Sequence, residues 1–208
     1  MIIKTVVVGP LQVNCYIVGD EKTGRAMVVD PGDEPDRILD LLRKNNLIVD
    51  YIVCTHGHFD HVGAVGDVKK ETNAKIVMNE GDLNIYDSAA ELAHYFGLEL
   101  EPQPTPDIFV AEGDTINVGT LHFAVFQSPG HSPGGIVLHG EGIVITGDTL
   151  FAGSIGRTDL PGGDESSIRK SLVRLLSLPE NMAVLSGHGP ASTIGREKRE
   201  NPFADPSW

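Results

Sequence analysis

Apolar residues in the first half of the chain gather in short runs bounded by glycine, proline or aspartate, a pattern typical of β-strands. We expect strands at residues 2–8, 15–18, 26–29, 51–54 and 75–78. Residues 35–45 place an isoleucine and three leucines on one side of a helical projection, and Pro35 suits a first turn. Further helices are predicted at 62–72 and 82–93, so strands and helices alternate.

The second half of the chain also consists of predicted strands and a helix. We expect strands at residues 115–118, 121–126, 136–139, 142–146 and 183–185, with a helix at 166–176. Residues 101–107 contain three prolines and can continue neither a helix nor a strand, so they are the predicted internal divider. We predict one domain spanning 1–208, with two pseudo-related halves that form two facing sheets with helices outside.

The composition of the chain disfavours membrane proteins and nucleic-acid-binding proteins. Hydrophobic residues make up 40% of the chain and charged residues 22%, as in ordinary globular proteins, and there is no run of eighteen apolar residues. Cys15 and Cys54 lie inside apolar runs and are predicted to be buried thiols, which fits a cytoplasmic location. A net charge of −13 disfavours nucleic-acid partners, which bind through clustered lysine and arginine.

The segment after the predicted strand at 51–54 is rich in groups that bind metals. His56, His58, Asp60 and His61 fall within six residues, on one predicted loop at a strand end. Imidazole and carboxylate are the usual ligands of zinc-like metals. Because adjacent residues such as Asp60 and His61 point in different directions, this motif favours two metal ions over one.

Three further candidates share a second pattern, in which an apolar strand is followed by glycine and then a potential ligand. They are His131, Asp148 and His188. One such residue alone is more often part of a turn, but three repeats of the pattern favour ligands.

The run from His56 to His61, together with the three later ligands, resembles the metallo-β-lactamase superfamily. That resemblance implies an α/β fold, a four-layer αββα sandwich of two mixed sheets. It implies a first metal held by His56, His58 and His131, a second held by Asp60, His61 and His188, and Asp148 bridging both. It also implies that Asp30, in an Asp-Pro-Gly turn, braces the metal loop.

The stretch Gly147-Asp148-Thr149 through Asp159 and the closing Asn201-Pro202-Phe203 are similar to the small glyoxalase II-like hydrolases. The implied reaction is attack of a metal-bridging hydroxide on a thioester carbonyl, with S-lactoylglutathione as the implied substrate. Zinc is the expected metal, with iron and manganese as alternatives. The larger glyoxalase II enzymes carry a C-terminal helical region that grips glutathione, whereas this chain stops at Trp208.

Two residues are assigned to the reaction itself. Asp60 is the expected catalytic carboxylate, and Arg157 is the cation expected to bind a substrate carboxylate, because a guanidinium can do so through two parallel hydrogen bonds. An ion pair between Arg157 and Asp159 or Asp164 is the competing interpretation.

Rival activities of the same superfamily stay open. A persulfide dioxygenase with one iron shares the Gly-Arg-Thr-Asp run, and a lactonase or another thioesterase would use the same metal centre. A β-lactamase fits less well, because the chain shows no secretory signal.

Overall fold

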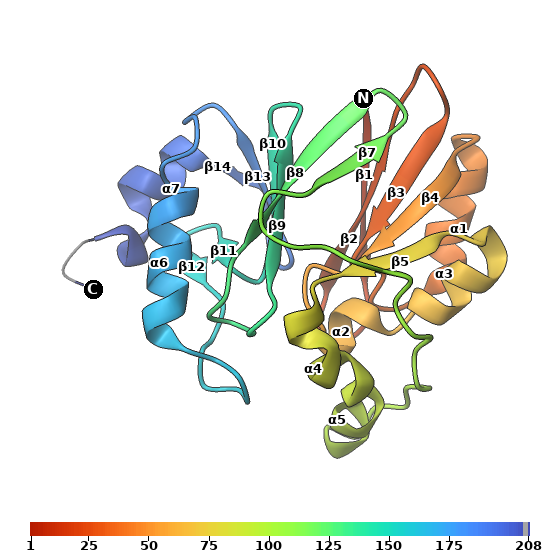
Figure 1. Ribbon diagram of the computed structural model, residues 1–208, viewed down its shortest axis with the longest axis horizontal. Coiled ribbons are helices and arrows are strands. Elements are labelled where there is room, and N and C mark those ends of the chain that lie inside the picture. Colours follow the sequence, from red (N-terminus) through yellow and green to blue (C-terminus); the bar gives the residue numbers. More distant parts are fainter. Residues whose placement is uncertain (206–207) are drawn as a thin grey trace.

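The computed structural model describes residues 1–205 and 208, and it contains two six-stranded sheets that face each other (Figure 1). The first sheet has the order β1-β2-β3-β4-β5-β6. Its strands are β1 (Ile2–Val8), β2 (Val13–Gly19), β3 (Arg25–Val29), β4 (Ile48–Val53), β5 (Lys75–Met78) and β6 (Ile108–Phe109). The first three pair antiparallel and the last four pair parallel, so the sheet is mixed, as predicted.

The second sheet has the order β14-β13-β10-β9-β8-β7. Its strands are β7 (Thr115–Val118), β8 (Leu121–Gln127), β9 (Ile136–Gly140), β10 (Ile143–Gly147), β13 (Ala183–Ser186) and β14 (Ser192–Thr193). β10 and β13 pair parallel, and the other neighbours pair antiparallel. A small hairpin of β11 (Leu150–Phe151) and β12 (Ser154–Ile155) follows β10.

Helices cover the outer face of each sheet (Figure 1). α1 (Pro35–Lys44) and α3 (Val65–Thr72) lie on the first sheet, and α6 (Glu165–Leu175) and α7 (Ile194–Glu200) lie on the second. Shorter helices stand at one end of the molecule: α2 (Phe59–Val62), η1 (Glu80–Asp82), α4 (Leu83–Asp87) and α5 (Ala89–Tyr95). A last turn, η2 (Pro202–Ala204), follows α7.

Three buried apolar clusters separate the four layers. One joins the first sheet to its helices through residues such as Ile17 and Ile38. The second lies between the sheets and includes Val18 and Phe123, and the third joins the second sheet to α6 through residues such as Val144. Neighbours such as Ile17 and Val18 alternate between clusters because successive strand residues point to opposite faces. These clusters confirm the predicted four-layer αββα sandwich.

Two predicted helices are shorter than expected. The helix predicted at 62–72 begins only at Val65, as α3, after a break at Gly63 and Ala64 where the Ala64 N–H donates to the Pro31 carbonyl (2.8 Å). The helix predicted at 82–93 is divided at Ser88, whose hydroxyl donates to the Asn84 carbonyl (2.8 Å). Such side-chain bonds compete with continued helix.

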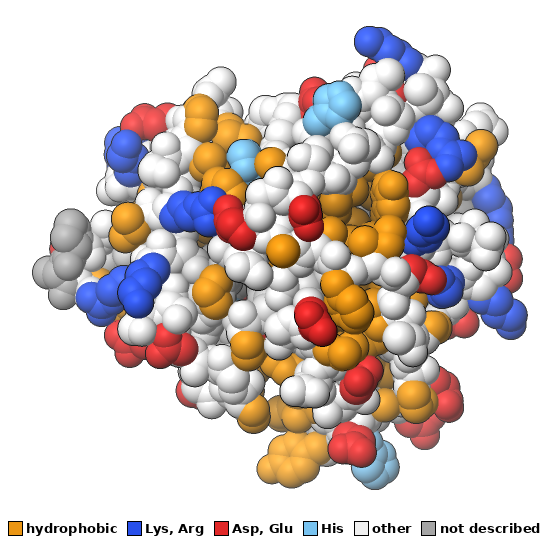
Figure 2. Space-filling view, in the orientation of Figure 1, with side chains coloured by type: hydrophobic (Ala, Val, Ile, Leu, Met, Phe, Trp, Pro, Cys, Tyr) orange, Lys and Arg blue, Asp and Glu red, His pale blue; other side chains and the backbone are white. Residues whose placement is uncertain are grey.

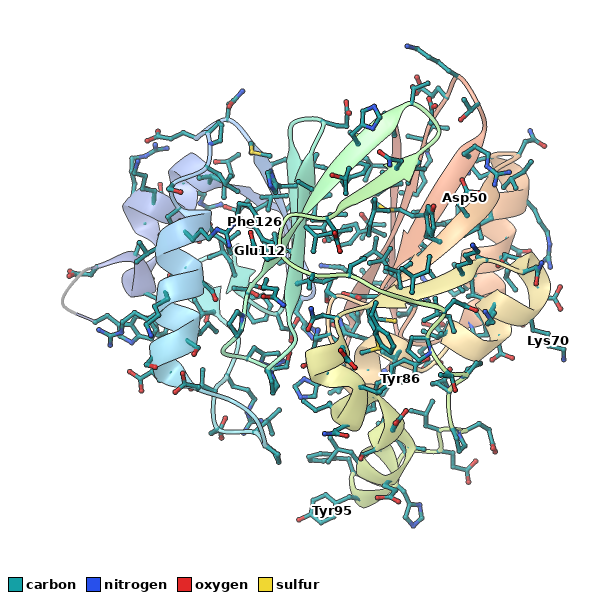
Figure 3. The ribbon with its side chains drawn as sticks, viewed as in Figure 1. Asp50, Lys70, Tyr86, Tyr95, Glu112 and Phe126 are labelled. Atoms are coloured by element: carbon teal, nitrogen blue, oxygen red, sulfur yellow. The ribbon has the colours of Figure 1, made fainter. Side chains whose placement is uncertain are left out.

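The proline-containing segment at residues 101–107 connects α5 to β6, and β6 still pairs with β5 in the first sheet. Tyr86 of α4 holds this segment by donating its hydroxyl to the Pro104 carbonyl (2.8 Å; Figure 3). The chain passes to the second sheet only after β6. Both cysteines are buried and free, as predicted. No helix among residues 1–205 and 208 is long and apolar enough to span a membrane.

Candidate metal centre

The histidine-rich motif begins on the loop after β4 and ends on a helix. His56 and His58 lie on the loop, whereas Asp60 and His61 lie in α2, which starts at Phe59. The expectation that all four share one loop is therefore corrected. Helical geometry turns successive side chains by about 100°, but Asp60 and His61 still bring their ligand atoms to one place, with His61 Nε2 3.7 Å from the Asp60 carboxylate.

The three distant candidates lie where the sequence predicted, directly after strands of the second sheet. His131 lies on the turn between β8 and β9, Asp148 follows β10, and His188 follows β13. The ends of these strands and of β4 meet at one edge of the sandwich. Residues up to 132 positions apart in sequence, such as His56 and His188, are thereby brought to one site.

The seven predicted ligands form two groups joined by Asp148. His56, His58 and His131 offer nitrogens within 4.8 Å of one another, and so do the ligand atoms of Asp60, His61 and His188. The Asp148 carboxylate lies 3.6 Å from His131 Nε2 in the first group. It also lies 3.3 Å from His61 Nε2 and 3.5 Å from His188 Nε2 in the second.

Hydrogen bonds on the outer nitrogens set the tautomers of His131 and His188. Nδ1 of His131 faces the backbone carbonyl of Arg157 (2.8 Å), and Nδ1 of His188 faces that of Leu11 (3.0 Å). A carbonyl only accepts, so each Nδ1 carries the hydrogen and each Nε2 keeps a lone pair directed into the centre. A neutral imidazole in this state is a metal ligand.

Asp30 and Thr55 set the tautomers of His56 and His61 in the same way. Asp30 accepts from His61 Nδ1 (3.0 Å) and from the Thr55 hydroxyl (2.7 Å). Because the Thr55 hydroxyl donates to Asp30, it accepts from His56 Nδ1 (3.1 Å). The Nε2 lone pairs of His56 and His61 are therefore free, and Asp30 braces the loop as the resemblance implied.

Two buried polar atoms at the centre have no hydrogen-bond partner: Nε2 of His56 and Oδ1 of Asp148. Such atoms are costly to bury unless something satisfies them. Nδ1 of His58 and Nε2 of His131 also face each other at 2.9 Å. A cation placed between these four atoms would accept a lone pair from each of them, so the residues fit a metal.

The carboxylates concentrate negative charge here. Burial raises the pKa of Asp60, but the charges of His61 and His188 outweigh burial and hold that pKa at about 2. Burial lowers the pKa of His61, but Asp148 and Asp60 outweigh burial and raise it well above its usual value. Burial, reinforced by His131, lowers the pKa of His58 to about 4. With no cation bound, the carboxylates therefore favour a proton on Nε2 of His61, which a cation would replace, while His58 stays neutral.

Asp30→Asn is expected to weaken metal binding by about tenfold to a hundredfold, because it removes the charge that orients His61 and Thr55. Asp30 has a positive φ of 52°, which asparagine tolerates, so this change tests the carboxylate and not the backbone. Affinity is measured by competition with a chelator. The matched control is Asp33→Asn, an exposed aspartate three residues away. Equal affinity in wild type and both variants would refute the bracing role.

Asp82 is a site residue that the sequence did not reveal. Its side chain is fully buried, and its carboxylate accepts from the N–H of Gly57 (2.9 Å) and from the N–H of Gly134 (2.5 Å). Gly57 lies between the first two histidines, and Gly134 lies on the turn that carries His131. Asp82 therefore ties together the two loops of the first ligand group. Its partners are backbone groups 25 and 52 residues away, which no local motif records.

Asn14 performs a similar task for the His188 loop. Its side-chain amide donates to the carbonyls of Ser186 and Gly189 (2.9 Å each), and its backbone N–H donates to Gly187 (2.7 Å). The Tyr16 hydroxyl donates to the same Ser186 carbonyl (2.8 Å). Strand β2 of the first sheet therefore holds a ligand loop of the second sheet, which fixes His188 relative to the ligands that follow β4.

Two glycines permit close approach of the ligand segments. A Cβ on Gly32 would lie 1.7 Å from the Asp60 carbonyl oxygen, and a Cβ on Gly156 would lie 1.9 Å from that of Asp148. Only a residue without a side chain fits at either position. Gly156 therefore allows the loop after β12 to pass beside Asp148 and to present the Arg157 carbonyl to His131.

The centre opens into a cavity of about 610 Å³. Five predicted ligands line it: His58, Asp60, His131, Asp148 and His188. Arg157 also lines it, but its exposed guanidinium makes two hydrogen bonds of 2.7 Å to Asp159. The ion pair is the competing interpretation from the sequence. Substrate binding by Arg157 stays a prediction, and its backbone carbonyl has the separate role of orienting His131.

Comparison with known proteins places this geometry in a family. The model of the Metallo-beta-lactamase superfamily matches residues 8–188. A hydroxyacylglutathione hydrolase, GloC, of Haemophilus influenzae is 37% identical, and the match covers 98% of each protein.

Two solved structures are also similar. The crystal structure of BLEG-1 B3 metallo-beta-lactamase superposes with a TM-score of 0.92 and 34% identity, covering 98% of this chain and 99% of that one. The crystal structure of TTHA1623 in a di-iron-bound form has a TM-score of 0.89 and 41% identity, covering 96% and 99%. With all seven predicted ligands gathered in one centre, the chain belongs to the metallo-β-lactamase superfamily.

Proposed function

We propose that this protein is a metal-dependent hydrolase that cleaves small-molecule thioesters in the manner of glyoxalase II. Water attacks the thioester carbonyl, the carbon–sulfur bond breaks, and the products are a carboxylic acid and a thiol. The observation that carries the thioester assignment is the match to GloC over 98% of both proteins, in a chain that has the whole ligand set. S-lactoylglutathione is the reference substrate.

The ligand set fits two divalent cations. Histidines 56, 58 and 131 would hold one, and Asp60, His61 and His188 the other, with Asp148 in contact with both groups. Zinc is the metal we expect, and iron or manganese also accept this mixture of nitrogen and oxygen donors. The TTHA1623 structure, in its di-iron-bound form, shows that a close structural relative holds two irons.

When bound, the cations would supply a water with a pKa near neutrality and a Lewis acid for the carbonyl oxygen. The chain's own residues do the rest. Asp60 is partly exposed to the cavity and stays a carboxylate, so it can accept a hydrogen bond from the attacking water and orient it. A substrate that covers the apolar side chains of the cavity would exclude other water, and we expect no nucleic-acid or membrane partner. We place the reaction in the cytoplasm.

The test is loss of the thioester absorbance of S-lactoylglutathione with protein of measured metal content. We expect hydrolysis that disappears after treatment with a chelator and returns when zinc is added. In a second assay, an oxygen electrode measures oxygen uptake with glutathione persulfide as substrate. Oxygen uptake by protein that carries one iron, without thioester hydrolysis, would replace this proposal with a persulfide dioxygenase. Hydrolysis of lactones alone would replace it with a lactonase.

A second candidate, β-lactam hydrolysis, is favoured by the superposition on BLEG-1 B3 metallo-beta-lactamase at a TM-score of 0.92. A chromogenic cephalosporin distinguishes the two activities in the same preparation. We expect kcat/KM for the thioester to exceed that for the cephalosporin, and the reverse order would favour the second candidate.

A further inference from the structure

Apart from the predicted ligands and Arg157, the walls of the site cavity are apolar. The lining side chains come from the turn after β1, from α2 and α5, and from loops that follow α5 and β12. They include Leu11, Phe59, Leu92, Phe96, Leu98 and Leu160. The ligand residues lie in the same cavity, so a thioester at the metal centre would place one of its two arms against this wall. A volume of about 610 Å³ is typical of a small-molecule site.

Part of this wall is apolar surface that water now covers. The Phe96 side chain is 55% exposed and that of Leu11 is 47% exposed. The Phe96 ring lies 5.8 Å from the ring of Phe59, which comes directly after His58, so the wall is continuous with the centre. Hydrophobic side chains also lie over α4 and α5 in Figure 2. Covering such surface is favourable in proportion to the apolar area removed from water.

Away from the metal centre, the cavity offers little to an anionic arm. Among the described residues that line it, Arg157 is the one lysine or arginine, and its guanidinium is already bound by Asp159. An adjoining cavity of about 430 Å³ shares Leu11 and Phe59 with it, and its lining includes the acidic side chains of Asp33, Asp67, Glu99 and Glu101. A thiol such as glutathione, whose two carboxylates outweigh its single ammonium group, would meet like charge there.

We propose that the physiological thioester carries an apolar acyl arm, which lies against Phe59, Phe96 and Leu160, on a thiol without net charge. This inference rests on the proposed thioester hydrolysis and names its substrate class. It separates recognition, which the apolar wall performs, from chemistry at the metal centre.

Acyl thioesters of N-acetylcysteamine, a neutral thiol, test the apolar arm. From acetyl through butyryl and hexanoyl to octanoyl, we expect kcat/KM to rise by up to about fourfold for each methylene that enters the cavity, because each buried methylene adds a fixed increment of transfer free energy. The rise in kcat/KM should come mainly from a lower KM, with kcat little changed. With the acyl group held as lactoyl, the neutral thioester should be hydrolysed with a higher kcat/KM than S-lactoylglutathione.

Phe96→Ala is expected to flatten this dependence on chain length, with about a tenfold loss of kcat/KM on the octanoyl thioester. Tyr95→Ala is the matched control. Its side chain is 82% exposed at the end of α5 and points away from the body of the molecule (Figure 3). It should leave the dependence as in the wild type. Equal losses in the two variants would mean that α5 acts only through its stability.

Asp159→Asn tests whether the lack of a free cation in the cavity disfavours an anionic substrate. Releasing Arg157 from its ion pair should raise kcat/KM for S-lactoylglutathione about twofold to fivefold relative to the neutral lactoyl thioester, the range of an exposed ion pair. The inference fails if S-lactoylglutathione is the better substrate of the wild type, or if rate is independent of chain length. Either result leaves thioester hydrolysis intact, whereas failure to hydrolyse every thioester would refute the proposed function instead.

Discussion

Asp148→Ala is expected to lower thioester hydrolysis about a thousandfold or more and to reduce the bound metal to one ion or none. Asp148 is within 3.6 Å of His61, His131 and His188 and so contacts both ligand groups. Its Oδ1 has no other partner. Residues that merely orient a ligand cost tenfold to a hundredfold when changed, and a direct ligand of two cations should cost more. Metal content and the thioester assay are measured on one preparation.

The control for this variant is Asp114→Ala, which removes an exposed carboxylate from the loop before β7. It should keep wild-type metal content and activity. Thermal unfolding of the metal-free proteins shows whether Asp148→Ala still folds. A folded Asp148→Ala protein that binds two metals and hydrolyses thioesters at the wild-type rate would contradict the assignment.

Asp82→Ala is expected to weaken metal binding about tenfold to a hundredfold without touching a ligand. The change leaves two buried backbone N–H groups, those of Gly57 and Gly134, without acceptors. Each costs about 1–3 kcal/mol, so the free energy of unfolding should fall by about 2–6 kcal/mol. The first ligand group is expected to suffer more, because Asp82 joins the loops of His56 and His131. Chelator competition and denaturant unfolding measure the two effects.

Asp87→Ala is the matched control, because Asp87 is an exposed aspartate at the end of the adjoining helix α4. A purely structural role for Asp82 predicts lower stability with unchanged metal affinity at a temperature where the variant is fully folded. A positioning role predicts lower affinity there as well. Wild-type affinity in folded Asp82→Ala would therefore refute positioning.

Much of the fold was predictable because the strands are short, apolar and sharply bounded. The predicted strand at residues 75–78 agrees with β5. The bounds of the helices were harder to predict. The break at Ala64 depends on the carbonyl of Pro31, and the break at Ser88 depends on the rotamer of its own side chain. The two-residue strands β6, β11, β12 and β14 carry too few residues for a periodic pattern, and partners elsewhere in the chain define them.

The candidate site was predictable to the extent that local motifs carry it. The first four ligands fall within six residues, and the other three repeat one strand-end pattern, so all seven could be named before their distances were known. Asp82 and Asn14 could not, because they bind backbone groups that every residue type presents. Arg157 shows a different limit. The sequence placed it near the centre but could not choose between a substrate and Asp159 as its partner.

Anomalous diffraction from crystals of the metal-loaded protein tests the central claim most directly. Data on either side of the absorption edge locate each ion independently of any assay. We expect two peaks, one within contact distance of His56, His58 and His131 and one near Asp60, His61 and His188, with Asp148 touching both. Protein that binds no metal at this edge of the sandwich, or binds it only elsewhere, would refute the two-metal assignment.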